Sequence, residues 1–164
     1  MKYLFIILSV SIVSCSNHES NNSKQNNLPI TRSQDSIAAV ASVTNFFKAF
    51  DDKDVKKIAL LLPGNMKIVH HNGAETSTSE MIKVIDETKN WWPRSRKLSN
   101  FEFVTDGKLS ILGLKNEVTF SLPGNKSVYE PYKETWIFEK VDNSLRPIRC
   151  HYSKVTVDKR EEFN

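Results

Sequence analysis

The 164-residue sequence contains few cysteines, no long apolar run and no basic tract, and each absence excludes a class of protein. Two cysteines are too few for a disulfide framework, and the ligands for a zinc finger or zinc ribbon are missing. The net charge of +4 is spread along the chain, with never more than two Lys or Arg in succession, so no nucleic-acid partner is expected. The chain has no G-x-S-x-G, P-loop or dinucleotide-binding motif, which argues against hydrolases, NTPases and Rossmann-type enzymes.

The composition that remains is that of a globular protein. Apolar residues make up 39% and charged residues 26% of the chain. This is too apolar for a disordered chain and too polar for a protein with many membrane spans. The length suits a single domain.

The N-terminal segment has the features of a secretory signal. Residues 4–13 (LFIILSVSIV) form an apolar run of ten residues behind Lys2. A permanent membrane-spanning helix needs about 20 apolar residues, so this run has instead the dimensions of a signal-peptide core. The sequence IVSC at 12–15 resembles the bacterial lipobox, and the resemblance implies a signal peptide over 1–14 and acylation of Cys15 with fatty acids such as palmitate. The alternative is an ordinary signal peptide with a coincidental cysteine.

Residues 16–33 are predicted to be a flexible tether. They hold five Asn and four Ser but only one Leu and one Ile, too little apolar surface to offset the entropy of the chain. Ser16 stands where an Asp would suggest retention in the inner membrane, by analogy with enterobacterial sorting. We therefore expect a lipid-anchored protein of the cell envelope, in the outer rather than the inner membrane, with a folded domain over 34–158 and a tail over 159–164.

Hydrophobic periodicity predicts three helices in the first part of this domain. The predicted elements are helices over 35–50, 54–62 and 77–92 and a short strand over 66–71. The second helix is ended by Pro63-Gly64 and the third by Pro93. Ser77 and Glu80 have the spacing of a capping box at the start of the third helix.

From residue 97 the pattern changes to strands. The predicted strands are 101–105, 109–112, 117–122, 129–139 and 145–157. Asp106-Gly107, between the first two, indicates either a hairpin or a bulge in one bent strand. Helices followed by antiparallel strands indicate the α+β class, in which a curved sheet would wrap around the helices and leave a cavity.

The last two strands can be paired by hand. Asp142-Asn143 suits a two-residue type I′ turn, because Asn tolerates the positive φ that this turn requires. In that register one face carries Glu134 opposite His151, Trp136 opposite Arg149, and Phe138 opposite Pro147. The other face carries Thr135, Ile137, Ile148, Cys150 and Tyr152. Pro147 lacks an N–H donor and suggests a bulge or an edge position in this strand.

Two phrases of the sequence resemble the NTF2-like superfamily, and within it the SnoaL-like branch. These are FFKAF at 46–50 leading to Asp54, and the ending ETWIF at 134–138 with IRCHYS at 148–153. The resemblance spans about residues 35–157. It implies a cone of three N-terminal helices packed on a strongly curved antiparallel sheet, with a pocket inside. It also implies frequent homodimers through the outer sheet face, here Ile137, Ile148 and Tyr152.

The predicted hairpin places two candidate pairs in this pocket. Glu134 beside His151 suits general acid/base catalysis, since a carboxylate raises the pKa of an imidazole and fixes its tautomer; the alternative is a hydrogen-bonded pair that only satisfies buried polarity. Trp136 with Arg149 would make a cationic, aromatic floor for an anionic or flat ligand. Alternatively, Trp136 fills the cone and Arg149 reaches solvent.

Other residues are expected at the edge of the pocket. Tyr132 lies on the same face as Glu134, and we place Trp92 at the pocket mouth. His70 and His71 are adjacent on one strand, so only one can face inward. No metal or cofactor is expected, since the sequence has no HExxH motif and no pair of histidines spaced for one face of a helix.

Three functions remain for such a protein. The sequence favours a membrane-tethered module that binds a small molecule, followed by an assembly module that dimerises through the outer sheet face. The alternative is a SnoaL-like isomerase, cyclase or dehydratase that uses His151 and Glu134 as its acid/base pair.

Overall fold

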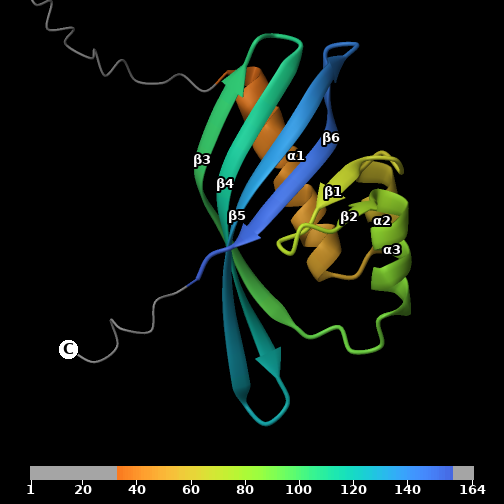
Figure 1. Cartoon of the computed structure of the whole chain (residues 1–164), viewed down its shortest axis with the longest axis vertical. Helices are drawn as coiled ribbons and strands as arrows, with labels where there is room; N and C mark the ends of the chain where they lie inside the picture. Colours follow the sequence, from red (N-terminus) through yellow and green to blue (C-terminus); the bar gives the residue numbers. More distant parts are fainter. Residues whose placement is uncertain (1–32, 157–164) are drawn as a thin grey trace, which may run out of the picture. The chain divides into compact units, whose positions relative to one another are not determined.

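The computed structural model describes residues 33–156, so the predicted signal peptide, Cys15 and most of the tether lie outside the described residues. The elements follow in the order α1 (Gln34–Asp51), α2 (Val55–Leu61), β1 (Lys67–Val69), β2 (Glu75–Ser77), α3 (Thr78–Glu87), β3 (Arg94–Thr105), β4 (Leu109–Leu122), β5 (Lys126–Val141) and β6 (Ser144–Lys154). Figure 1 shows this arrangement. Within residues 33–156, no helix is both long and apolar enough to span a bilayer.

Side-chain caps fix where the helices begin. The hydroxyl of Ser33 accepts a hydrogen bond from the backbone N–H of Ser36 at the start of α1, and α2 starts at the cap Asp54. The capping box of Ser77 and Glu80 is formed at α3, as the sequence predicts. However, α3 ends at Glu87, five residues before the predicted end, because the chain turns to an extended conformation that carries Trp91 towards α1.

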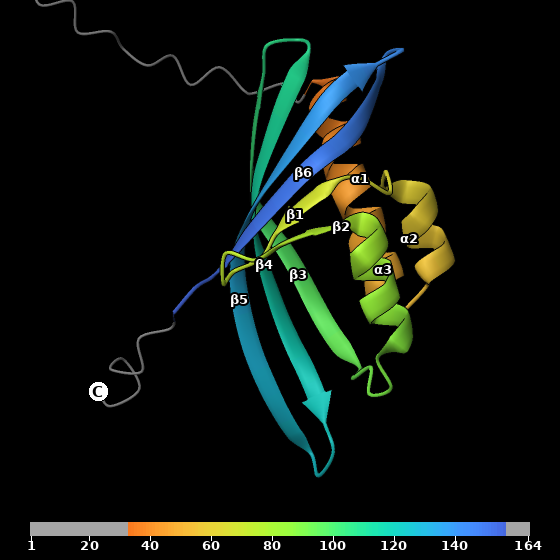
Figure 2. The same ribbon diagram turned by 45° about the vertical axis from the view of Figure 1, so that its right-hand side comes forward.

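The six strands form one open, mixed sheet. Their order is β2-β1-β6-β5-β4-β3. β1 runs parallel to β6 and every other neighbouring pair is antiparallel, so the prediction of an antiparallel sheet is wrong at this one pair. β1 lies between β6 and the edge strand β2, so β6 is an interior strand of the sheet. The helices lie on one side of the sheet (Figure 2).

β3 and β4 form a hairpin, which resolves the alternatives left by Asp106-Gly107. Gly107 has a φ of +91°, and the two strands pair on both sides of this turn. β4 then continues without a break through both predicted strands, 109–112 and 117–122. In β3 the register shifts between Ser99 and Glu102, and Asn100 has a φ of +53°; such a bulge bends the sheet.

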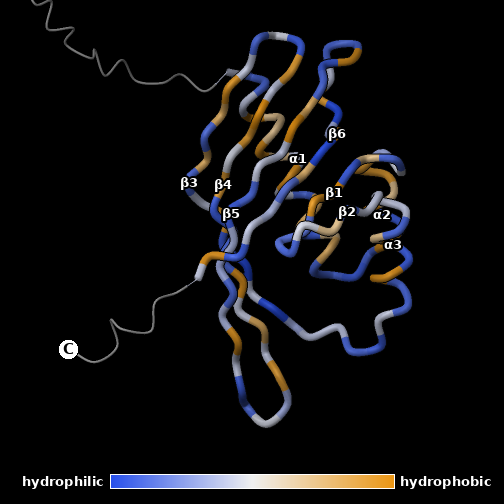
Figure 3. Tube along the Cα trace, viewed as in Figure 1, coloured by the Kyte–Doolittle hydropathy of each residue, from blue (hydrophilic) through white to orange (hydrophobic). Residues whose placement is uncertain are grey.

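Alternation along the strands builds the core on the helix side of the sheet. Hydrophobic and hydrophilic residues alternate along β3 and β4 in Figure 3. The fully or almost fully buried core residues include Ala39, Val43, Phe46, Ile58, Met66, Leu112, Trp136 and Phe138. α1 therefore lies against the inward side chains of the central strands.

The final hairpin follows the predicted register for only half of its length. Both turn residues have positive φ, +48° at Asp142 and +61° at Asn143, as a type I′ turn requires. Phe138 pairs with Pro147 as predicted, but the register then shifts and Ile137 pairs with Arg149. Ile148 is the extra residue of a bulge next to Pro147, which has no N–H to give to the ladder.

This bulge reverses which side chains of β6 face the helices. Trp136 pairs with Cys150 and Glu134 with Tyr152, so Cys150 and Tyr152 face inward. Arg149 and His151 face outward, and the register predicted for this part of the strand is therefore wrong. One inserted residue is sufficient for this, because side chains alternate with a period of two.

The outer face of the sheet carries an apolar row. Val104, Ile111 and Ile137 are paired across β3, β4 and β5, and Val104 is 67% exposed. Tyr152, which we expected on this face, points into the pocket instead. A homodimer through the outer face stays a prediction.

Candidate functional site

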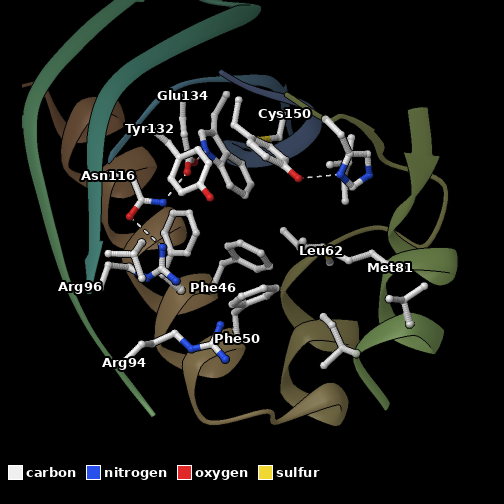
Figure 4. Close-up of a pocket in the computed structure, with 18 of the residues that line it drawn as sticks. Phe46, Phe50, Leu62, Met81, Arg94, Arg96, Asn116, Tyr132, Glu134 and Cys150 are labelled. Atoms are coloured by element: carbon white, nitrogen blue, oxygen red, sulfur yellow. Dashed lines mark hydrogen bonds between the residues drawn. The ribbon is translucent and has the colours of Figure 1, made fainter. Parts of the chain in front are cut away.

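A cavity of about 330 Å³ lies between the inner face of the sheet and the helices. Eight aromatic side chains line it: Phe46, Phe47, Phe50, Trp91, Phe120, Tyr132, Trp136 and Tyr152. In Figure 4, Arg94, Arg96 and Asn116 approach from the sheet, and Leu62 and Met81 lie on the opposite side. The volume falls within the range of small-molecule sites, about 300–1,000 Å³.

A chain of hydrogen bonds crosses the sheet side of the cavity. Arg96 donates from Nε and Nη2 to the two carboxylate oxygens of Asp51, at 2.8 and 2.7 Å, and from Nη1 to the amide oxygen of Asn116 at 2.7 Å. The amide nitrogen of Asn116 donates to Glu134 at 2.5 Å, and the indole nitrogen of Trp136 donates to the other oxygen of Glu134 at 2.8 Å. Side chains from α1, β3, β4 and β5 are thus fixed in one network.

Glu134 is a buried carboxyl group inside an aromatic cavity. Its residue is 6% exposed, and burial raises its pKa, although the hydrogen bonds from Asn116 and Trp136 and the charge of Arg96 lower it in part. Both oxygens accept a hydrogen bond from a fixed donor. This arrangement makes Glu134 chiefly the acceptor that orients its two neighbours.

Two guanidinium groups stack on the aromatic lining. The Cζ of Arg96 lies 4.2 Å from the ring centroid of Phe47, and that of Arg94 lies 4.2 Å from Trp91 and 4.9 Å from Phe120. Such cation–π contacts strengthen when the cation is shielded from water. Burial is also the main reason why the pKa of Arg94 is lowered, yet a guanidinium stays protonated at neutral pH.

A second polar group lies at the β1 side of the cavity. The hydroxyl of Tyr152 is 2.6 Å from Nδ1 of His70, whose Nε2 is 2.7 Å from the hydroxyl of Thr76. Burial, followed by the nearby charge of His71, lowers the pKa of His70. The imidazole is therefore mainly neutral near pH 7 and can accept a proton or a hydrogen bond on only one of its nitrogens.

The cavity contains some of the predicted site residues. Tyr132, Glu134 and Trp136 line it, and the hydroxyl of Tyr132 donates to Glu130. Of the two adjacent histidines, His70 faces inward, which settles the alternative that the sequence left open. Trp91 lines the cavity with its indole nitrogen bound to the carbonyl of Asp51 at 3.1 Å.

Three predicted site residues lie elsewhere. His151 is exposed on the outer face, so the pair of Glu134 and His151 is not formed. Arg149 is also on the outside, where it pairs with Glu75 at 2.9 Å. Trp92 does not line the cavity, because the chain after α3 turns Trp91 rather than Trp92 towards it.

The sequence interpretation missed Arg94, Arg96 and Asn116. Arg94, Arg96 and Leu98 alternate on one face of β3, and the apolar Leu98 packs against the core. That alternation was the available signal, but it is weak because two of the three residues are charged. Among residues 33–156, no three His, Cys, Asp or Glu side chains come together as a metal site would require.

Comparisons with known proteins identify the fold. No protein-family model matches the chain, and no curated protein sequence matches it. A solved structure from Streptomyces avermitilis, described as a candidate dehydratase of the NTF2-like family, is 14% identical with a TM-score of 0.64 and covers 77% of this chain and 100% of its own. An NTF2-like protein with a cystatin-like fold from Novosphingobium aromaticivorans is 11% identical, with a TM-score of 0.65 and coverage of 77% and 85%.

The association domain of C. elegans CaMKII is a third similar structure. It is 12% identical with a TM-score of 0.61, and the match covers 70% of this chain and 92% of that domain. These similarities establish an α+β, NTF2-like fold, as the sequence resemblance implied. Because folds of this kind host unrelated activities, the function has to be argued from the cavity.

Proposed function

We propose that this protein is a membrane-tethered lipoprotein whose NTF2-like domain binds a small, mainly aromatic molecule in the cavity. The observation that carries the proposal is the aromatic lining of a cavity of about 330 Å³. Eight aromatic rings offer a large stacking surface, and a few fixed polar groups can orient the ligand.

An enzyme of the isomerase, cyclase or dehydratase kind is less well supported. The predicted acid/base pair is split between the two faces of the sheet. Glu134 remains in the cavity, but both of its oxygens accept hydrogen bonds from Asn116 and Trp136. Among residues 33–156, Glu134 has no hydrogen bond to a second titratable side chain that could exchange a proton with it, so binding explains this geometry better than proton transfer. The proposal that the domain binds a small molecule includes its assignment to the SnoaL-like branch of the NTF2-like superfamily.

Ligand binding is tested by blocking the cavity from its helix side. Met81 lines the cavity and is only half-buried, so the larger side chain of Met81→Trp should fill part of the cavity. We expect 2-acetylnaphthalene, an uncharged bicyclic aromatic, to bind the wild type in calorimetric titration and to bind Met81→Trp at least about tenfold more weakly.

Leu60→Trp is the matched control, since Leu60 is 88% exposed on α2 and does not line the cavity. It should bind the probe as the wild type does. Equal binding by Met81→Trp and the wild type, or no binding by the wild type, would contradict the proposal.

The membrane anchor rests on the lipobox-like IVSC at 12–15. Several acyl chains on Cys15 would hold the protein firmly, since each buried CH₂ contributes about 0.8 kcal/mol. We expect Cys15→Ser to move the protein from the membrane fraction to the soluble fraction and to abolish labelling with radioactive palmitate. A labelled, membrane-bound Cys15→Ser variant would disprove the anchor, and the outer membrane as its location is part of the same proposal.

A further inference from the structure

The guanidinium of Arg94 faces the cavity with unused hydrogen-bond donors. Its side chain is only 6% exposed, and Figure 4 places it beside Phe50 at one end of the cavity. A guanidinium carries five N–H donors. Nε donates to the carbonyl of Trp92 at 3.0 Å, whereas the two terminal nitrogens make no hydrogen bond with any residue of 33–156.

Arg96 is the natural comparison for Arg94, because the two residues lie on the same face of the same strand but differ in their hydrogen bonds. All three nitrogens of Arg96 are engaged, two by Asp51 and one by Asn116. Both carboxylate oxygens of Asp51 thus already accept hydrogen bonds from Arg96. The distance from Asp51 Oδ1 to Arg94 Nε is 3.9 Å. Two guanidinium groups therefore share one carboxylate.

The other acidic group of the cavity does not neutralise Arg94. Glu134 lies at the opposite end of the cavity in Figure 4 and is held by Asn116 and Trp136. A largely buried charge without its own partner is costly in a protein. This cost is offset if a bound molecule supplies the missing anion.

The surroundings of Arg94 favour a flat anion. Its Cζ lies 4.2 Å from the ring centroid of Trp91, 4.9 Å from Phe120 and 5.7 Å from Phe50. These rings flank the guanidinium and orient its plane, and the low exposure of the side chain strengthens a charge-assisted hydrogen bond to it. The two terminal nitrogens match the spacing of a carboxylate, so the bond would be bidentate.

We propose that the cavity binds a planar aromatic carboxylate, with the carboxylate on the terminal nitrogens of Arg94 and the ring among the aromatic side chains. This inference rests on the proposed binding function and names the class of its ligand. The competing role for Arg94 is purely structural, namely to fix the segment before β3 through the carbonyl of Trp92. That role alone gives no preference for an anionic ligand.

The test compares 2-naphthoate with 2-acetylnaphthalene, which has the same shape but no charge, by calorimetric titration. We expect the wild type to bind naphthoate about tenfold or more tightly than the ketone. Arg94→Met keeps a long apolar side chain and should abolish this preference while still binding the ketone. Arg149→Met is the matched control, because Arg149 lies on the outer face and should leave the preference unchanged.

Each outcome bears on one proposal or on both. Equal binding of the two probes by the wild type would overturn the carboxylate inference and leave the binding function standing. A preference that survives in Arg94→Met would overturn the assignment to Arg94. If neither probe binds the wild type, both proposals fail. Because the first comparison uses only the wild type, it remains decisive even if Arg94→Met does not fold.

Discussion

The cavity has two walls that are built in different ways. The sheet wall contains a polar group formed by Arg94, Arg96, Asn116, Glu134 and Trp136, and four of these five residues are joined by hydrogen bonds of 2.5–2.8 Å. The helix-side wall, formed by Leu62, Met81 and Val84, is apolar, and Val84 is 64% exposed. Side chains of the first wall are fixed by directional bonds, whereas those of the second are held mostly by packing.

This difference assigns separate tasks to the two walls. Hydrogen bonds within the sheet wall preorganise its groups, so the orientation and charge of a ligand are best read there. The unbranched side chain of Met81 adapts to different shapes, so the helix-side wall is better suited to set size and access. The energetic cost of a substitution should therefore differ strongly between the walls.

The largest effect is expected from breaking the network at Arg96. Arg96→Met removes the partner of Asp51 and leaves the oxygen of Asn116 without its donor. Loss of one partner of a largely buried ion pair destabilises a protein by several kcal/mol. Because Asp51 keeps some exposure, we expect the free energy of unfolding in urea to fall by about 3 kcal/mol.

Arg94→Met is the internal comparison for this prediction. Arg94 has one hydrogen bond, a 3.9 Å ion-pair contact with Asp51 and its ring contacts to lose, so its removal should change the free energy of unfolding by no more than about 1 kcal/mol. If the two variants were equally destabilised, the distinction between a saturated and an unsaturated guanidinium would be wrong.

Much of the fold could be predicted from the sequence because its signals are local. The capping box at Ser77, the turn at Asp142-Asn143 and the apolar stripe of α1 each depend on residues a few positions apart. The parallel pairing of β1 with β6 joins residues about 80 positions apart, such as Ile68 and Cys150, and no local pattern specifies it.

The site was harder to predict because one bulge determines which side chains of β6 face the cavity. Glu134 and Trp136 follow from the alternation along β5, and the structure places both inward. Pro147 indicates a bulge, but not on which side of it the extra residue lies. Since that residue is Ile148, Arg149 and His151 exchange faces with Cys150 and Tyr152. The guanidinium groups that line the cavity, Arg94 and Arg96, come from β3 and not from β6.

The smallest effect is expected from the titration of His70, which lies at the β1 side of the cavity. Its pKa in the folded protein is lowered by burial, so the unfolded chain binds a proton more readily than the native state does. Stability from this group is present above the unfolded pKa, near 6.5, and is lost as the pH falls through that value. The free energy of unfolding of the wild type should thus decrease from about pH 7.5 to about pH 5.5.

The His70→Gln variant isolates this contribution from that of the acidic residues. Gln can still bond to Tyr152 or Thr76 but does not titrate, so its pH dependence over the same range should be shallower than that of the wild type. His71→Gln, which replaces the exposed neighbour, should keep most of the wild-type slope. A wild-type slope in His70→Gln would mean that protonation of His70 costs nothing, and that the β1 side of the cavity is open to water.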